Sequence, residues 1–122
     1  RQRQMCIRDS FTIEEKEEQE RMVLESVDRF LERDVEPFAH ELEADDTYPQ
    51  EIVEKMIDMG LFGATIGTEY GGLGLSVSTY AKIVERVSTV WMSVSGIFNS
   101  HLIMAAAVER SGTEVQKAKW LP

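Results

Sequence analysis

Cysteine, histidine and proline are scarce in this sequence. Its 122 residues include one cysteine, Cys6, and two histidines, His40 and His101. A single cysteine excludes an internal disulfide and a zinc site built from several cysteines, and it fits a reducing compartment. Only three prolines interrupt the chain, and almost no segment has the alternating pattern of a strand. Helix is therefore the expected secondary structure.

Basic residues are also in short supply, with 13 against 22 acidic ones and a net charge of −9. Such a surface repels phosphate backbones and anionic membranes, so we expect no nucleic-acid partner. A helical DNA-binding regulator would need a basic recognition helix, and the most basic helix expected is the short one with Lys117 and Lys119. No apolar run approaches the ~20 residues that span a bilayer, so no membrane span is expected.

Residues 1–10, RQRQMCIRDS, differ from the rest because they are basic and lack an apolar period. We interpret them as a cloning or assembly artefact, or as a disordered leader. The alternative is a basic targeting arm, for which the stretch is short and weakly amphipathic. Residues 11–122 have the size of one domain.

From Phe11 onward, apolar residues recur at every third or fourth position, which predicts an all-α fold of five to six helices. Thr12 and Glu15 have the spacing of a capping box, so the first long helix should begin there. Pro37 should break or bend that helix, and a short second helix with Phe38 and Leu42 on its apolar face should follow as far as the acidic turn at Asp45 and Asp46. The apolar stripe of the first helix is predicted to contain Val23, Val27, Phe30 and Leu31.

A third helix is expected between Pro49, which suits a first helical turn, and Gly60, which suits a helix end. Its predicted buried side is Ile52, Val53, Met56 and Ile57. The following segment, 61–76, is rich in glycine among large apolar residues, which predicts an ordered, tightly turning loop. A fourth helix then follows from Val77.

The segment from Trp91 to Val108 carries no charge and is apolar or small nearly all round. This pattern predicts a central helix enclosed by its neighbours, around which the others pack. Gly112 should end it, and Thr113 should cap a short final helix.

The reactive side chains are too few for a self-contained active site. Neighbouring acidic residues on a helix point in different directions, so the acidic clusters read as a solvated face. The glycine loop has neither dinucleotide spacing nor the Lys-Ser or Lys-Thr of a phosphate-binding loop. His101 is expected to be a hydrogen-bonded core imidazole and His40 to be solvated. We predict no catalytic, cofactor-binding or metal-binding residue in the chain.

Small and polar residues interrupt the uncharged helix at Ser95, Gly96, Asn99 and Ser100. Buried polar atoms cost free energy unless they have partners. Ser95 and Asn99 share one face, with Leu102 and Ile103 about one turn further on. Two interpretations stay open: this face borders a ligand cavity or another domain, or it packs closely with its hydrogen bonds satisfied internally.

Two motifs, IGTEYGGLGLS at 66–76 and SGTEVQKAKWLP at 111–122, closely resemble the N-terminal domain of acyl-CoA dehydrogenases. Their order and separation fit, as does the segment IFNSHLIMAAAVER between them, and the helix opening at Tyr48 and Pro49. The resemblance covers residues 11–122. The loop departs from the common wording at Gly67 and Thr68, where proline and glutamate are usual.

The resemblance implies an N-terminal helical domain that is followed, in a full enzyme, by an FAD-binding β-domain and a C-terminal helical bundle. In that family a carboxylate of the C-terminal bundle removes the α-proton of an acyl-CoA thioester, while the flavin accepts a hydride from the β-carbon. No residue here matches that base, so residues 1–122 alone are expected to be inactive.

The resemblance further implies an electron-transfer flavoprotein as a partner and a homotetramer for the full-length enzyme. A cytoplasmic location is expected in a bacterium and the mitochondrial matrix in a eukaryote.

Substrate-binding residues follow from the same resemblance. Ungapped matching back from Gly112 places Ser95, Asn99 and Ile103 where the family lines the acyl-chain pocket, with Phe98 and Leu102 beside them.

The expected acyl chain is neutral. Family members that take dicarboxylic acyl groups resemble one another in an arginine on this helix, whereas this sequence has Val94 and no cation from Trp91 to Glu109. Trp120 and Leu121 resemble the pair that leads into the β-domain and are expected to be exposed.

A non-enzymatic acidic helical interaction module is the alternative interpretation. The sequence after Pro122 distinguishes the two, because a flavin-binding β-domain supports the dehydrogenase and a genuine stop codon supports the module.

Overall fold

The computed structural model describes residues 12–122, so the expectations for residues 1–10 lie outside the described part. This part contains no strand, which confirms the all-α prediction. It has five α-helices: α2 (Ile13–Phe30), α3 (Glu36–Ala44), α4 (Gln50–Asp58), α5 (Val77–Ser111) and α6 (Glu114–Trp120).

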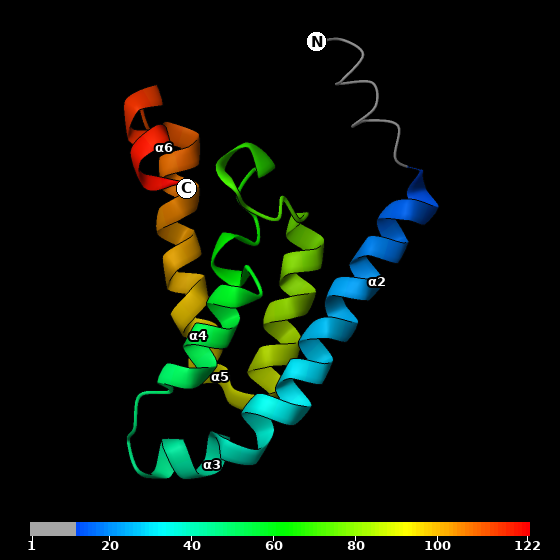
Figure 1. Cartoon of the computed structure of the whole chain (residues 1–122), viewed down its shortest axis with the longest axis vertical. Helices are drawn as coiled ribbons and strands as arrows, with labels where there is room; N and C mark the ends of the chain where they lie inside the picture. The colour runs from blue at the N-terminus through cyan, green and yellow to red at the C-terminus, as the bar shows by residue number, and fades with distance from the viewer. Residues whose placement is uncertain (1–11) are drawn as a thin grey trace.

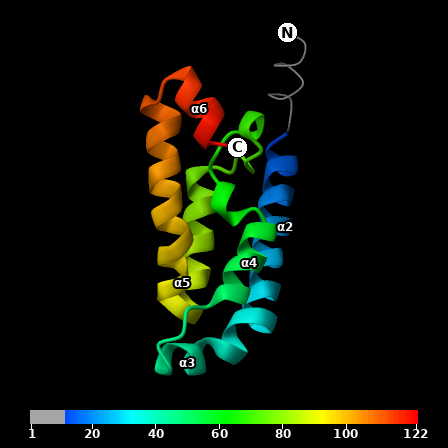
Figure 2. The ribbon, with the colours of Figure 1, turned by 60° about the vertical axis from the view of Figure 1, so that its left-hand side comes forward.

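Helices α2 and α4 and the two halves of α5 run lengthwise, and the short helices α3 and α6 lie at opposite ends (Figure 1). Helix α2 leads down to α3, α4 returns, and α5 descends and then climbs again beside its own first half. In the turned view, α3 again lies at one end, and α6 lies at the other end near the glycine-rich loop (Figure 2). The core between these helices contains 18 buried apolar residues, among which Phe98, Met56 and Leu61 are the largest that are fully buried.

Helix α2 begins where the sequence predicts, and it ends at Phe30, seven residues before the break predicted at Pro37. The Thr12 side chain accepts a hydrogen bond from Glu15 N, and the Glu15 side chain accepts one from Thr12 N, which completes the capping box. A π-helical turn, Leu31–Val35, follows α2, and Pro37 then occupies the first turn of α3, where the chain changes direction. Leu24, Val27 and Phe30 form the buried stripe of α2.

Helix α4 confirms most of its prediction. Ile52, Val53 and Met56 are buried, and Gly60 ends the segment with a left-handed φ of 81°. Ile57 was predicted to be buried and is 55% exposed, so this prediction is wrong. Each helical residue advances by about 100°, which carries Ile57 past the edge of the stripe that Ile52 and Met56 define.

The glycine-rich loop 61–76 is ordered by its own backbone. Leu73 N donates to Gly63 O at 2.9 Å, Gly74 N to Ile66 O at 2.9 Å, and Leu75 N to Ala64 O at 2.8 Å. The two halves of the loop therefore bind each other, with Gly72 between them. A Cβ on Gly72 would lie 2.2 Å from Ile66 O, which explains why only glycine fits there.

Helix α5 is a hairpin of two arms, which the sequence predicts as two separate helices. Trp91 has an extended conformation, with φ −158° and ψ 100°, and this one residue reverses the chain. Hydrogen bonds join Tyr80 to Asn99 and Ser88 to Ser95 across the arms, so the first arm (77–90) and the second arm (92–111) lie side by side.

The second arm is enclosed on one side only, so the prediction of a fully enclosed helix is wrong for its outer side. Val94, Phe98 and Leu102 are buried, whereas Met92, Ile103 and Met104 are 64–73% exposed. An arm with apolar residues all round needs neighbours on all sides, and the described helices supply them on one side.

One helix of the described part, α5, is long and apolar enough to cross a membrane by length and composition alone. By that measure α5 is an exception to the expectation from the sequence. It is a weak indication of a span, because core helices of globular domains share these properties and because α5 reverses at Trp91.

The C-terminal end also follows the prediction. Gly112 ends α5, and the Thr113 side chain accepts from Gln116 N at the start of α6. Trp120 is 65% exposed, as expected, whereas Leu121 is partly buried against the core.

Substitution of two glycines by alanine should have opposite effects on stability. Gly72→Ala is expected to destabilise the fold by about 2 kcal/mol or more, because its Cβ would collide with the carbonyl oxygens of Ile66 and Gly63. Gly96→Ala is expected to stabilise it by about 0.5–1 kcal/mol, since Gly96 lies inside a helix with open space around its Cα. Denaturant unfolding of both variants checks this, and equal effects would contradict the loop geometry.

The link between α2 and α5 should make stability depend on pH. Glu20 accepts a hydrogen bond from Lys82 and one from the buried Thr79 hydroxyl at 2.6 Å, and these partners lower the pKa of the Glu20 carboxyl. Its stabilisation is therefore present above the ordinary carboxyl pKa and is lost as the pH falls through the lowered value. Glu20→Gln should reduce the difference in melting temperature between neutral and acid pH. Glu17→Gln, on the same helix and exposed, is the control and should leave that difference unchanged.

Candidate functional site

The five predicted pocket residues lie at three depths on the second arm of α5. Ser95, Phe98 and Leu102 point inward, with 6%, 0% and 3% of their surfaces exposed. Asn99 is half-buried. Ile103 is 64% exposed. The arm therefore presents Asn99 at the boundary between the core and the outer face, and Ile103 on that face.

Ser95 has its hydrogen bonds inside the hairpin. Its hydroxyl donates to Met92 O at 2.6 Å and accepts from the Ser88 hydroxyl at 2.9 Å. These two bonds satisfy a polar group that would otherwise be costly to bury. For Ser95, the arrangement agrees with the interpretation of close packing with internal hydrogen bonds.

Asn99 is bound by a residue that the sequence does not single out. The Tyr80 hydroxyl donates to Asn99 Oδ1 at 2.6 Å from the first arm. The Tyr80 ring meets the Phe98 ring edge to face, with centroids 6.2 Å apart. Burial raises the pKa of the Tyr80 hydroxyl, so it stays protonated and acts as a donor at neutral pH. The spacing of Tyr80 in the helix indicates burial, but only the hairpin brings it to Asn99.

The outer face of the second arm is apolar and uncharged. We define it by Met92, Gly96, Ile103 and Met104, all exposed. Ser100 is exposed on the same arm. Val94 is instead fully buried, so its side chain belongs to the core. The charge that a ligand on the outer face would meet therefore depends on the exposed residues and not on Val94. No residue between Trp91 and Glu109 supplies a cation there.

The glycine-rich loop is attached near the C-terminal end of this arm. Gly67 N donates to Glu109 Oε2 at 3.0 Å, which attaches the glycine-rich loop to the second arm. His101 was predicted to be a hydrogen-bonded core residue and is exposed, so this prediction is wrong. Its ring packs edge-on against Phe62 of the loop, with centroids 5.2 Å apart, because His101 lies between the buried and the outer faces of the helix. His40 is exposed, as predicted.

The glycine-rich loop does not have the geometry of a phosphate cradle. The amides that would face an anion are used within the loop, since Gly72 N donates to Gly67 O at 3.2 Å and Leu73 N, Gly74 N and Leu75 N also bond backbone carbonyls. Close packing is therefore the role of these glycines. In residues 12–122, no group of three or more His, Cys, Asp or Glu residues is arranged to hold a metal ion.

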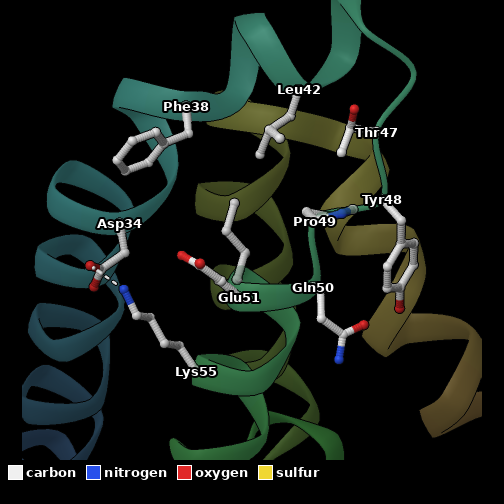
Figure 3. Close-up of a pocket in the computed structure, with 10 residues that line it drawn as sticks. Asp34, Phe38, Leu42, Thr47, Tyr48, Pro49, Gln50, Glu51 and Lys55 are labelled. Carbon is white, nitrogen blue, oxygen red and sulfur yellow. Dashed lines mark hydrogen bonds and ion pairs between the residues drawn. The ribbon is translucent and has the colours of Figure 1, made fainter.

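A cavity of about 340 Å³ lies elsewhere, between α3 and α4 (Figure 3). Phe38 and Leu42 of α3 point toward α4, and Lys55 Nζ pairs with Asp34 at 2.8 Å on one side. The Lys55 ammonium lowers the pKa of the Asp34 carboxyl. The lining residues are Asp34, Phe38, Leu42, Thr47, Tyr48, Pro49, Gln50, Glu51, Ile52 and Lys55. None of the five predicted pocket residues is among them.

The domain combines a long helix that reverses at one residue, a glycine-rich loop attached to that helix, and a capped final helix. A known protein family matches its sequence. The profile of the acyl-CoA dehydrogenase N-terminal domain matches residues 17–122. The chain therefore belongs to the acyl-CoA dehydrogenase family and corresponds to its N-terminal domain.

Individual relatives agree with this assignment. The chain is 36% identical to (2S)-methylsuccinyl-CoA dehydrogenase of Cereibacter sphaeroides, over 87% of this chain and 20% of the relative. It is 35% identical to the short-chain specific acyl-CoA dehydrogenase of Clostridium acetobutylicum, over 84% of this chain and 27% of the relative. It is 34% identical to 3-(aryl)acrylate reductase of Clostridium sporogenes, over 85% and 28%. The chain thus spans 20–28% of the length of these relatives.

Proposed function

We propose that this chain is part of a flavin-dependent enzyme that introduces an α,β double bond into an acyl-CoA thioester. Within that enzyme, the domain forms one wall of the acyl-chain pocket and packs against the other domains. The observation that carries the proposal is the outer face of the second arm, which is apolar, uncharged and exposed in this member of the family.

The exposed apolar residues of the outer face suit a surface that a ligand or another domain covers. Met92, Ile103 and Met104 expose 73%, 64% and 67% of their surfaces to water, and neighbouring large apolar residues on one helix mark a binding or packing surface. On α6, Val115 and Trp120 are also exposed, at 78% and 65%. A hydrocarbon chain and the apolar side chains of another domain both suit the outer face, because neither brings a charge that would need a partner.

Ser95, Phe98, Asn99, Leu102 and Ile103 remain the proposed substrate-binding residues, with unequal roles. Ile103 and Asn99 are the residues that a ligand on the outer face would touch. Ser95, Phe98 and Leu102 hold the arm in place from the core side, since they are buried.

The flavin and the catalytic base are assigned to other parts of the protein. The loop amides of this chain are occupied by loop carbonyls, so the described residues do not fit an FAD phosphate site. No step of the chemistry is assigned to residues 12–122 beyond excluding water from the acyl chain and positioning it. Residues 1–122 alone are accordingly proposed to be inactive.

The direction of the reaction depends on the electron carrier. Oxidation by an electron-transfer flavoprotein is our proposal, together with a homotetramer and a location in the bacterial cytoplasm or the mitochondrial matrix. Two relatives are named for the reverse direction, 3-(aryl)acrylate reductase and the acryloyl-CoA reductase (NADH) of Anaerotignum propionicum, which is 33% identical over 77% of this chain. Reduction of an α,β-unsaturated acyl group is therefore the second candidate, and it uses the same pocket wall.

A charged substitution on the outer face should affect the full-length enzyme and not the stability of the domain. Ile103→Lys should change the free energy of unfolding of the domain by less than about 0.5 kcal/mol, since Ile103 is exposed. In the full-length protein it should lower kcat/KM for butyryl-CoA by about tenfold or more, because an unpaired ammonium would be buried beside the acyl chain. Met22→Lys, at a 60% exposed position on α2, is the matched control. Equal, small effects of both variants would contradict the role of the outer face.

The full-length enzyme should prefer a neutral acyl chain over one that ends in a carboxylate. Anaerobic flavin bleaching with butyryl-CoA and with glutaryl-CoA measures this preference directly. A second carboxylate has no cation to meet between Trp91 and Glu109, and its burial would be costly. Equal or faster reduction by glutaryl-CoA would contradict the proposed neutral pocket, and no reduction by any acyl-CoA would favour the non-enzymatic interaction module.

A further inference from the structure

The cavity between α3 and α4 has no part in the proposed function, because none of the proposed substrate-binding residues lines it. Its lining is largely apolar: Pro49 and Ile52 are buried, and Leu42 is half-buried. Phe38 and Tyr48 stand on opposite sides of it in Figure 3 and are 51% and 59% exposed. Its volume of about 340 Å³ is in the range of pockets that bind a ligand. The cavity can therefore accept one large apolar group.

The helices that form this cavity are strongly acidic. Residues 36–58, which contain α3 and α4, carry eight acidic side chains and one basic one, Lys55. All eight acidic side chains are exposed, and within residues 12–122 none of them forms an ion pair. They are Glu36, Glu41, Glu43, Asp45, Asp46, Glu51, Glu54 and Asp58. This end of the domain therefore has a negative potential that the chain does not compensate.

Glu51 brings this charge to the cavity itself. It lies in the first turn of α4, lines the cavity and is exposed. The other lining carboxylate, Asp34, is paired with Lys55 at 2.8 Å, so these two charges neutralise each other. In the described part of the chain, the Glu51 carboxylate has neither a hydrogen bond nor an ion pair. A cation beside Glu51 would therefore gain a partner at the edge of an apolar cavity.

We propose that this cavity binds a basic amphipathic helix of a partner protein. One large apolar side chain of that helix occupies the cavity, and its lysine or arginine residues face Glu51 and the neighbouring acidic side chains. A buried apolar anchor surrounded by complementary charge is a common arrangement in protein–protein interfaces. The surface is separate from the acyl-chain pocket, so the inference does not depend on the proposed function.

Charge decides among the candidate occupants. A second copy of this chain has a net charge of −9 and would be repelled by the acidic side chains of α3 and α4. Nucleic acids, anionic membranes and acyl-CoA, which carry phosphate groups, are disfavoured for the same reason. A neutral apolar ligand would fill the cavity but would leave Glu51 without a partner. A basic partner with an apolar anchor satisfies both features.

The test uses the full-length protein and a synthetic peptide of known composition. The probe is a fluorescein-labelled amphipathic helix of about 15 residues, with lysines on one face, leucines on the other and a single tryptophan among the leucines. Fluorescence anisotropy should show saturable binding that weakens by about tenfold or more when the salt concentration rises to about 0.3 M. The same peptide with glutamate in place of every lysine should not bind.

A charge reversal locates the binding on the domain. Glu51→Lys should weaken binding of the lysine peptide by about tenfold or more, because it places a like charge at the cavity. Glu17→Lys makes the same change of net charge at an exposed position of α2 and is the matched control. It should weaken binding by less than about threefold, since exposed charges far from the peptide are screened by salt.

A coupling measurement shows whether the tryptophan enters the cavity. Phe38→Ala and a peptide with alanine in place of tryptophan should each weaken binding by about fivefold. Combined, they should weaken it by less than the product of the two effects, because both remove the same contact. Met22→Ala, at a 60% exposed position on α2, is the control and should leave the affinity unchanged.

Failure of the lysine peptide to bind, equal binding of the glutamate peptide, or equal effects of Glu51→Lys and Glu17→Lys would overturn the inference. Effects of Phe38→Ala and of the alanine peptide that multiply would overturn it as well, since the tryptophan would then lie elsewhere. Each of these results leaves the proposed function intact, because none of them concerns the reaction of an acyl-CoA thioester.

Discussion

The reversal of α5 at Trp91 is the constraint on which the rest of this domain depends. One extended residue turns an apolar helix back on itself, so that the two arms share their buried faces. Phe98, Val94 and Leu102 of the second arm meet Ile83 and Val87 of the first arm within one core. Helix α2 is then attached to the first arm through Glu20, and the glycine-rich loop to the second arm through Glu109. The other elements are arranged around this hairpin.

The two faces of the second arm have different surroundings. The inner face is buried by other parts of this chain, and the polar groups of Ser95 and Asn99 have hydrogen-bond partners there. The outer face is also uncharged and carries Met92, Ile103 and Met104, which have no cover among residues 12–122. The domain therefore folds around one half of its central element and presents the other half, which agrees with a unit that spans 20–28% of its relatives.

Much of the fold could be predicted from the sequence because local rules decide it. The capping boxes at Thr12 and Thr113, the change of direction at Pro37 and the left-handed Gly60 depend on a few neighbouring residues. Burial on both sides of the second arm could not be decided in this way. An uncharged sequence has the same composition whether its cover is in the same chain or elsewhere, so the exposure of Ile103 and His101 was not predictable from pattern.

The candidate site was predictable only in part, for a related reason. Periodicity places Ser95 and Asn99 on one helix face, but their partners Ser88 and Tyr80 come from the other arm. The pairing depends on how sharply the chain turns at Trp91, and no local signal specifies a one-residue reversal. The family resemblance identifies positions along the second arm, whereas the structure adds which of them face inward.

A turn of one residue also fixes the rotational phase of one arm against the other. Each residue turns a helix by about 100°, so inserting or deleting a single residue next to Trp91 would swing the whole second arm around its axis. Asn99 and Ser95 would leave their partners, and part of the outer face would rotate into the core. The number of residues in the turn therefore sets the rotation of the second arm relative to the first, which makes the stretch around Trp91 intolerant of insertions and deletions.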